Sequence, residues 1–84
     1  MVTVIVTPQA LKQADTLPRM IQGRVLRIVR RLENWPGVSG AKPLRHGLAG
    51  RYRIRTGDYR VQFHVEGGSL IVEKIGHRDG FYED

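Results

Sequence analysis

Cysteine is absent from this chain of 84 residues. Its absence excludes disulfide bonds, catalysis by a thiolate and zinc sites built on cysteine, and it is compatible with a reducing compartment. No apolar run approaches the length needed to cross a membrane. The short run over residues 2–6 lacks the basic leader and the small-residue cleavage site of a signal peptide. We therefore expect a cytoplasmic protein with no membrane partner.

Several chemical motifs are missing as well. The chain has no carboxylate pair for acid and base catalysis, no histidine-rich metal spacing, no serine nucleophile motif and no glycine loop that would cradle a phosphate. These absences argue against metal-dependent hydrolysis and against nucleotide binding. We accordingly expect neither a cofactor nor a bound metal.

Acidic residues are few relative to basic ones. The chain has 8 Asp and Glu against 14 Lys and Arg, which gives a net charge of +6, and 11 of the 14 cations are arginines. The planar guanidinium group suits bidentate contact with phosphate, whereas lysine would serve solubility equally well. This composition predicts a partner that carries phosphates, or an acidic protein.

The length and the periodicity of the chain predict one domain, residues 1–84, of the α+β class. An N-terminal strand over residues 1–6 is followed by a short helix that Thr7 caps and Pro8 opens, and then by a longer helix over residues 18–34. Three strands joined by hairpins follow. We expect a two-helix hairpin packed on one face of a sheet formed by this three-stranded antiparallel meander, with the opposite face left for function.

Residues 51–65 alternate strictly between polar and apolar side chains. If Gly57 and Asp58 form a two-residue turn, counting outward places Arg55 opposite Arg60, and all cationic side chains share one face. Like charges directly opposite each other destabilise a hairpin, so this pair is best explained by an anion bound between them. The alternative explanation is a charged strand face that prevents pairing with another sheet edge.

A second turn at Gly67 and Gly68 brings the last strand against the cationic hairpin. Counting from it predicts that Phe63 pairs with Val72 and that Arg60 pairs with Ile75, which leaves Ile75 on the cationic face. This register brings the segment 76–78 just beyond the turn that carries Arg55 and Arg60. We therefore predict that cations distant in sequence converge at one end of the sheet.

Three groups of residues together resemble the RelE/ParE toxin superfamily over the whole chain. They are Pro43-Leu44-Arg45 with Gly47 to Gly50, then Tyr52-Arg53-Ile54-Arg55 with Gly57-Asp58-Tyr59-Arg60-Val61, and finally Gly76-His77-Arg78 with Tyr82. The resemblance implies a RelE-like fold and the role of toxin in a bacterial type II toxin-antitoxin system. RelE-type members cut mRNA in the ribosomal A site, ParE-type members inhibit DNA gyrase instead, and an antitoxin encoded beside the toxin neutralises either type.

The resemblance also implies functional positions. The catalytic set carried over comprises Arg53, Arg55, Arg60, Arg78 and Tyr82. RelE-type enzymes often have lysine where this chain has Arg53 and Arg55, which leaves the general base open because arginine hardly deprotonates. Metal-free cleavage of RNA needs a base for the 2′-OH, cations for the phosphate oxygens and an acid for the leaving oxygen.

Histidine titrates near neutrality, and His77 stands beside the predicted cluster, so it is a candidate base in the catalytic set. It could equally cap the strand end and bond the backbone, and His64 is expected to be a surface residue. The RNA- and ribosome-binding residues are predicted to be Lys42, Arg45, His46 and Arg51. The expected partners are the ribosome, mRNA and an acidic or amphipathic antitoxin segment in a hetero-oligomer. The alternatives are a ParE-like gyrase inhibitor and a basic nucleic-acid-binding domain without catalysis.

Overall fold

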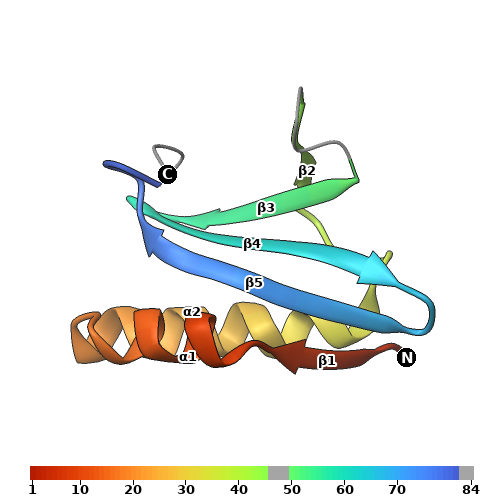
Figure 1. Ribbon diagram of the computed structural model, residues 1–84, viewed down its shortest axis with the longest axis horizontal. Coiled ribbons are helices and arrows are strands. Elements are labelled where there is room, and N and C mark those ends of the chain that lie inside the picture. Colours follow the sequence, from red (N-terminus) through yellow and green to blue (C-terminus); the bar gives the residue numbers. More distant parts are fainter. Residues whose placement is uncertain (46–49, 82–84) are drawn as a thin grey trace.

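The computed structural model describes residues 1–45 and 50–81. The described residues form, in chain order, β1 (Thr3–Val6), α1 (Pro8–Asp15), α2 (Arg19–Arg31), the short 3-10 helix η1 (Leu32–Asn34), β2 (Lys42–Pro43), β3 (Arg51–Thr56), β4 (Tyr59–Glu66) and β5 (Ser69–His77), as Figure 1 shows. Among these residues, no helix combines the length and the apolar character that a membrane crossing requires.

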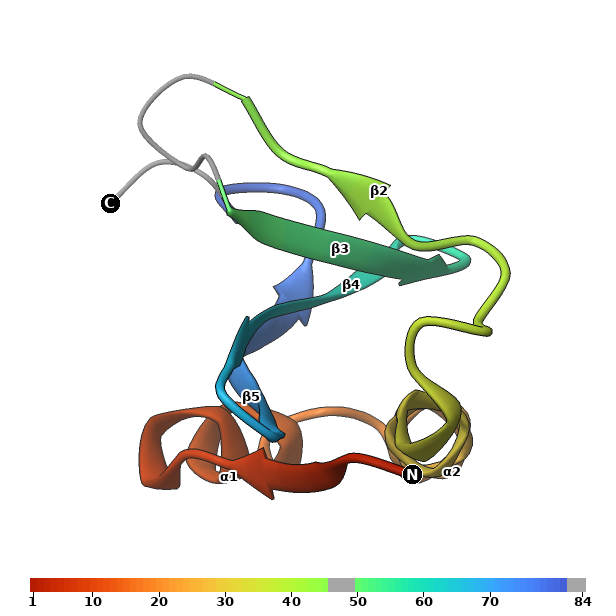
Figure 2. The same ribbon diagram turned by 90° about the vertical axis from the view of Figure 1, so that its right-hand side faces the viewer.

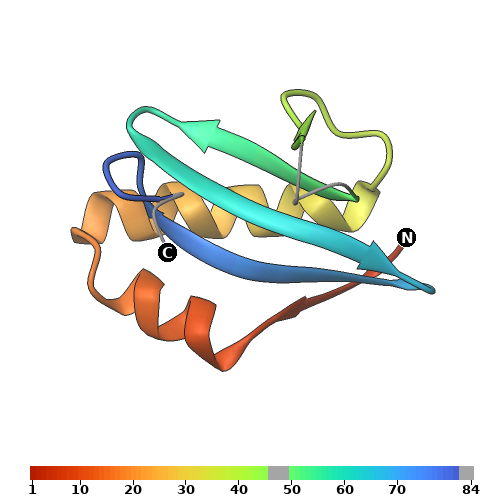
Figure 3. The same ribbon diagram turned by 45° about the horizontal axis from the view of Figure 1, so that its top comes forward.

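The helices begin where the sequence predicts. The hydroxyl oxygen of Thr7 accepts a hydrogen bond from the backbone N–H of Ala10 at 3.1 Å, which satisfies one of the free donors at the start of α1. Pro18 precedes α2 directly, and η1 extends this helix by one tighter turn. The chain reverses direction between the two helices, so they form the expected hairpin (Figure 3).

Both helices lie on the same side of β3, β4 and β5, below these strands in Figures 1 and 2, and the predicted α+β architecture is confirmed. The sheet has five strands in the order β1-β5-β4-β3-β2. At one edge β1 pairs with β5 in parallel, and at the other the short strand β2 pairs with β3 in the antiparallel direction. The core between sheet and helices contains Leu32 of η1 and Phe63 of β4, both fully buried. Trp35 packs against Phe63 and Tyr52, with ring centroids 5.2 and 4.9 Å away, and so attaches the end of η1 to the sheet.

The predicted register of the cationic hairpin is confirmed at every pair. Arg55 lies opposite Arg60, Arg53 opposite Gln62, and Tyr52 opposite Phe63. Because residues directly opposite in a ladder share a face, the polar members of these pairs leave the backbone on the face away from the helices.

The register between β4 and β5 departs from the prediction at one point. Phe63 pairs with Val72 as expected, but the next pair is Gln62 with Lys74, so that Glu73 is an extra residue in a β-bulge. The predicted pairing of Arg60 with Ile75 is therefore wrong. The bulge turns Ile75 into the core, where it is only 2% exposed. Burial of this apolar side chain makes the bulged pairing more stable than the regular register, which would leave Ile75 on the cationic face.

Candidate phosphate-binding site

The face of the sheet that the helices leave uncovered carries four arginines. Three of them come from β3 and one from β4: Arg51, Arg53, Arg55 and Arg60. Between them Ile54 points the other way and is buried in the core, 2% exposed. Strict alternation along β3 therefore separates a hydrophobic face from a cationic one, as the sequence predicts.

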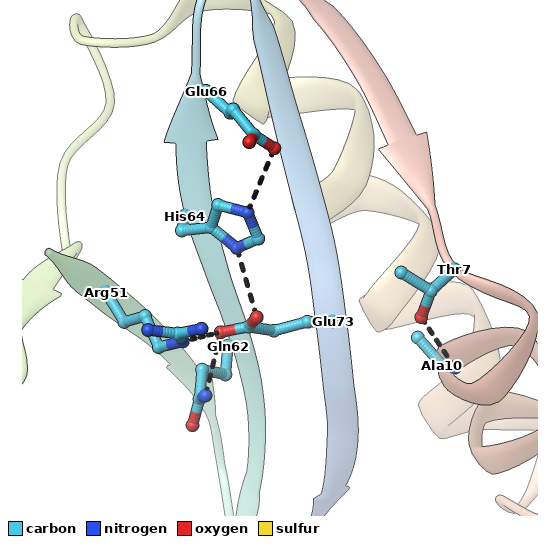
Figure 4. A network of polar contacts seen from close by, with 7 residues as sticks. All are labelled: Thr7, Ala10, Arg51, Gln62, His64, Glu66 and Glu73. Atoms are coloured by element: carbon cyan, nitrogen blue, oxygen red, sulfur yellow. Dashed lines mark hydrogen bonds and ion pairs between the residues drawn. The ribbon is translucent and has the colours of Figure 1, made fainter. Parts of the chain in front are cut away.

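One half of this cationic face is neutralised within the chain, as Figure 4 shows. The carboxylate of Glu73 accepts hydrogen bonds from Arg51 Nε at 2.8 Å and from Gln62 Nε2 at 2.9 Å, both on Oε2. Its other oxygen lies 3.0 Å from Nδ1 of His64. The second ring nitrogen of His64 is 3.7 Å from the carboxylate of Glu66. Glu73 is thus the centre of a network that joins β3, β4 and β5.

This network changes the interpretation of two sequence-predicted residues. Arg51, predicted to hold RNA, is ion-paired to Glu73 and has part of its charge compensated. His64, expected to be a simple surface residue, is only 25% exposed at its side chain and is held by the same carboxylate. Sequence reasoning did not single out Glu73, although the predicted register already sets this carboxylate opposite Gln62 on the cationic face, and that position was the signal that could have found it.

The other half of the face keeps unpartnered donors. Arg53 Nη1 and Arg60 Nε and Nη1 are buried atoms for which the described residues supply no hydrogen-bond acceptor. Buried polar groups are nearly always satisfied, and a buried guanidinium without an acceptor is costly. Phosphate oxygens would provide charge-assisted acceptors for these donors. The unpartnered atoms of Arg53 and Arg60 therefore mark the centre of a candidate anion site.

A further cation reaches this end of the sheet from the C-terminal side. The backbone N–H of Arg78 donates to the carbonyl of Asp58 at 2.7 Å, which fixes Arg78 beside the β3–β4 turn. Its guanidinium Nε lies 3.8 Å from the carboxylate of Asp58 and 3.7 Å from that of Asp79. The same turn is flanked by Arg55 and Arg60. The structure thus brings together the arginines that the sequence expects to converge.

His77 does not join the arginines on their face. It pairs with Tyr59, next to Arg60 in the strand, and its ring meets the Tyr59 ring edge-on at 5.1 Å between centroids. Alternation along β4 places this pair on the opposite side of the ladder from Arg60. The backbone N–H of Asp79 donates to His77 Nδ1 at 3.1 Å, so the neutral ring carries its proton on Nε2. This arrangement matches the alternative role of His77 as a backbone-bonded residue at the strand end.

The predicted RNA-binding residues lie at the β2 side of the sheet. Lys42 is exposed and pairs with Arg53, so it belongs to the cationic face, and Arg45 is exposed nearby in the chain. His46 and Tyr82 lie outside the described residues. Within the described part of the chain, no group of three His, Cys, Asp or Glu side chains could hold a metal ion.

The fold and the site together define a small basic α+β protein that buries one face of its sheet under a helix hairpin and presents arginines on the other. The chain matches the family described as ParE toxin of type II toxin-antitoxin system, parDE, over residues 4–80, and it belongs to this family of toxins. The predicted membership in the RelE/ParE superfamily is confirmed.

Individual relatives cover nearly the whole chain. Toxin RelE3 of Methanocaldococcus jannaschii is 28% identical over 76 residues, which span 87% of this chain and 86% of the relative. A chain in the crystal structure of the toxin-antitoxin complex RelBE2 from Mycobacterium tuberculosis superposes with a TM-score of 0.79 at 26% identity, covering 92% of this chain and 98% of that one. The isolated RelE toxin of E. coli shares the fold, with a TM-score of 0.76 at 18% identity over 92% of this chain and 84% of its own.

Proposed function

We propose that this toxin is a RelE-type, ribosome-dependent endoribonuclease that cuts translated mRNA in the A site and so arrests growth. The observation that carries the proposal is the set of buried, unpartnered guanidinium atoms of Arg53 and Arg60 on the open face of the sheet. An arginine that only kept the sheet edge charged would have its guanidinium exposed to water. Buried guanidinium donors without acceptors within the protein are instead positioned to bind an anionic ligand.

In the proposed reaction the 2′-oxygen attacks the adjacent phosphorus while the bond from phosphorus to the 5′-oxygen breaks. Arg53 and Arg60 stabilise the phosphate oxygens as negative charge develops on them, and Arg55 and Arg78 add positive charge from either side of the β3–β4 turn. A general base takes the 2′-OH proton. His77 lies on the opposite side of the ladder from Arg60, so we assign it no proton transfer at this phosphate; the leaving 5′-oxygen is stabilised by Arg78 and takes its proton from water.

We assign Tyr82, which lies outside the described residues, to orienting the 2′-OH or stacking on a base. Lys42, Arg45 and His46 remain predicted contacts of the message or of ribosomal RNA. Arg51 would contribute there only after its ion pair with Glu73 opens.

We further propose a cognate antitoxin as the physiological partner, in a hetero-oligomeric complex. The M. tuberculosis relative was crystallised as a toxin-antitoxin complex, and a net charge of +6 favours an acidic segment electrostatically. Such a segment would supply acceptors to the same donors of Arg53 and Arg60 that we assign to phosphate. Neutralisation by direct occlusion of the cationic face follows from this competition.

A second candidate function is inhibition of DNA gyrase without RNA cleavage. It is favoured by the match to the ParE family itself and by the position of His77 behind the ladder, since a gyrase binder needs no proton donor next to Arg60. A non-catalytic RNA-binding domain would also explain the unpartnered arginines.

The test adds the purified toxin to an in vitro translation reaction and maps mRNA ends by primer extension, with ribosome-free mRNA and a gyrase supercoiling assay in parallel. We expect cuts only on translated mRNA, reduced about 100- to 1000-fold in Arg60→Ala. The matched control is Arg30→Ala, which removes one charge from the exposed surface of α2. Intact mRNA with blocked supercoiling would assign the protein to the gyrase-inhibiting class, and full cleavage by Arg60→Ala would disprove the proposed site.

A further inference from the structure

A second concentration of arginines lies away from the open face, in a hollow between α2 and the edge of β3. The hollow is lined by Arg24, Arg27, Ile28, Arg31, Arg55 and Thr56. The three helical arginines follow a spacing of three and four residues, which places them in one row along α2. β2 pairs only with Tyr52 and Arg53, so β3 is an open edge at Arg55, and this side chain can face the helix.

These arginines are not neutralised within the described part of the chain. Arg31 donates to the backbone carbonyl of Ser39 at 2.8 Å, which orients it without compensating its charge. No carboxylate of the described residues lies within 4.0 Å of the guanidinium of Arg24, Arg27 or Arg55. Like charges in neighbouring helical turns repel, so a row of this kind is maintained at a cost in stability. An anion bound in the hollow would offset this repulsion between the arginines and stabilise the folded protein.

The hollow adjoins the β3–β4 turn. A Cβ atom built on Gly57 of this turn would lie 3.8 Å from Nη1 of Arg24. Arg55 lines the hollow and is also the cross-strand partner of Arg60. The cationic surface therefore extends from Arg60 around the turn and onto α2.

We propose that this hollow is a second phosphate-binding site, which holds a phosphodiester of the same RNA strand whose neighbouring phosphate binds at Arg53 and Arg60. The assignment of this ligand as the RNA substrate rests on the proposed function. The lining supports a nucleic-acid backbone over an acidic protein segment, because Ile28 is its only large apolar side chain. Protein partners need buried apolar anchors, whereas arginines that follow a backbone suffice for a nucleic acid.

The test measures binding of a short fluorescent single-stranded RNA as a function of salt concentration. The test variant is the double substitution Arg24→Ala with Arg27→Ala. The matched control is Arg19→Ala with Arg30→Ala, which removes the same charge from exposed positions of the same helix outside the hollow. Each lost phosphate contact reduces the slope of log K against log salt by about 0.7 for a single strand.

We expect the slope to fall by about 1.4 in the test variant and to stay near that of the wild type in the control. Affinity at low salt should fall at least tenfold more in the test variant than in the control. Equal losses in both variants would overturn the inference, because they would report net charge and not a site. Unchanged RNA binding with weakened binding of the cognate antitoxin would also overturn it, since the occupant would then be an acidic protein.

Two readouts separate this inference from the proposed function. RNA binding that depends on the hollow, without any translation-dependent cleavage, would support the hollow and refute the nuclease. Cleavage with wild-type RNA binding in the test variant would support the nuclease and refute the hollow. The urea unfolding midpoint of each variant shows whether it is folded, and Arg27→Gln, which keeps most of the side chain, replaces the double variant if that one unfolds.

Discussion

Removal of the Glu73 carboxylate should destabilise the protein through the donors that it leaves behind. In Glu73→Ala, the amide of Gln62, which is 6% exposed, loses its acceptor. A buried donor without a partner costs about 1–3 kcal/mol. Arg51, with a side chain 39% exposed, can turn to water, so its lost ion pair adds about 1 kcal/mol or less. The free energy of unfolding should fall by about 1–4 kcal/mol in total.

Urea denaturation followed by circular dichroism measures this change as a lower midpoint with an unchanged slope. A thermal midpoint should fall by roughly 4–8 °C for each kcal/mol in a domain of this size. Glu73→Gln is the first comparison, because its amide oxygen can still accept from Gln62, and we expect it to lose about 1 kcal/mol or less. Glu66→Ala is the control, since this carboxylate is 78% exposed and 3.7 Å from His64. Equal stability of Glu73→Ala and Glu66→Ala would refute the reasoning.

Three further substitutions, two of them paired with a comparison variant, test the fold by the same denaturation experiment. Leu32→Ala empties a fully buried position and should cost about 3–4 kcal/mol, and a loss below 1 kcal/mol would mean that the core collapses into the space. Gly57→Ala places a side chain at φ 60° in the β3–β4 turn and should cost about 1–2 kcal/mol, whereas Gly23→Ala, inside α2 with free space around it, should be neutral or stabilising. Thr7→Ala removes the cap of α1 and should cost about 1 kcal/mol, and Thr7→Ser should restore most of it.

The cationic hairpin could be predicted from sequence because two independent signals agree. The glycine at the turn sets the register, and alternation over β3 and β4 then separates the faces without conflict. The helices were predictable for a similar reason, since Thr7 and Pro8 mark a start and the spacing of Ile21, Val25 and Ile28 marks one buried side. Short-range geometry determines each of these features.

The bulge in β5 was not predicted, although the chain contains a sign of it. Leu70 and Val72 are two residues apart, but the next core residue, Ile75, follows after three. A regular ladder would have left Ile75 on the cationic face, and that misfit is the sign of an extra residue. Everything beyond the bulge is shifted by one position as a result, which is why His77 pairs with Tyr59 and lies on the opposite face from Arg60, whereas the regular register would have left it on the cationic face.

The same bulge determines which arginines remain available for a ligand. It places Glu73 and Lys74 next to each other on the open face, and the carboxylate then engages Arg51, Gln62 and His64. Arg53 and Arg60 lie beyond its reach and keep buried donors without acceptors. These unsatisfied donors destabilise the folded protein. Any anion that supplies acceptors to them therefore stabilises the native state, to an extent set by its concentration and affinity. Under the proposed function, RNA and antitoxin both do this through the same two side chains, and each must therefore weaken the binding of the other.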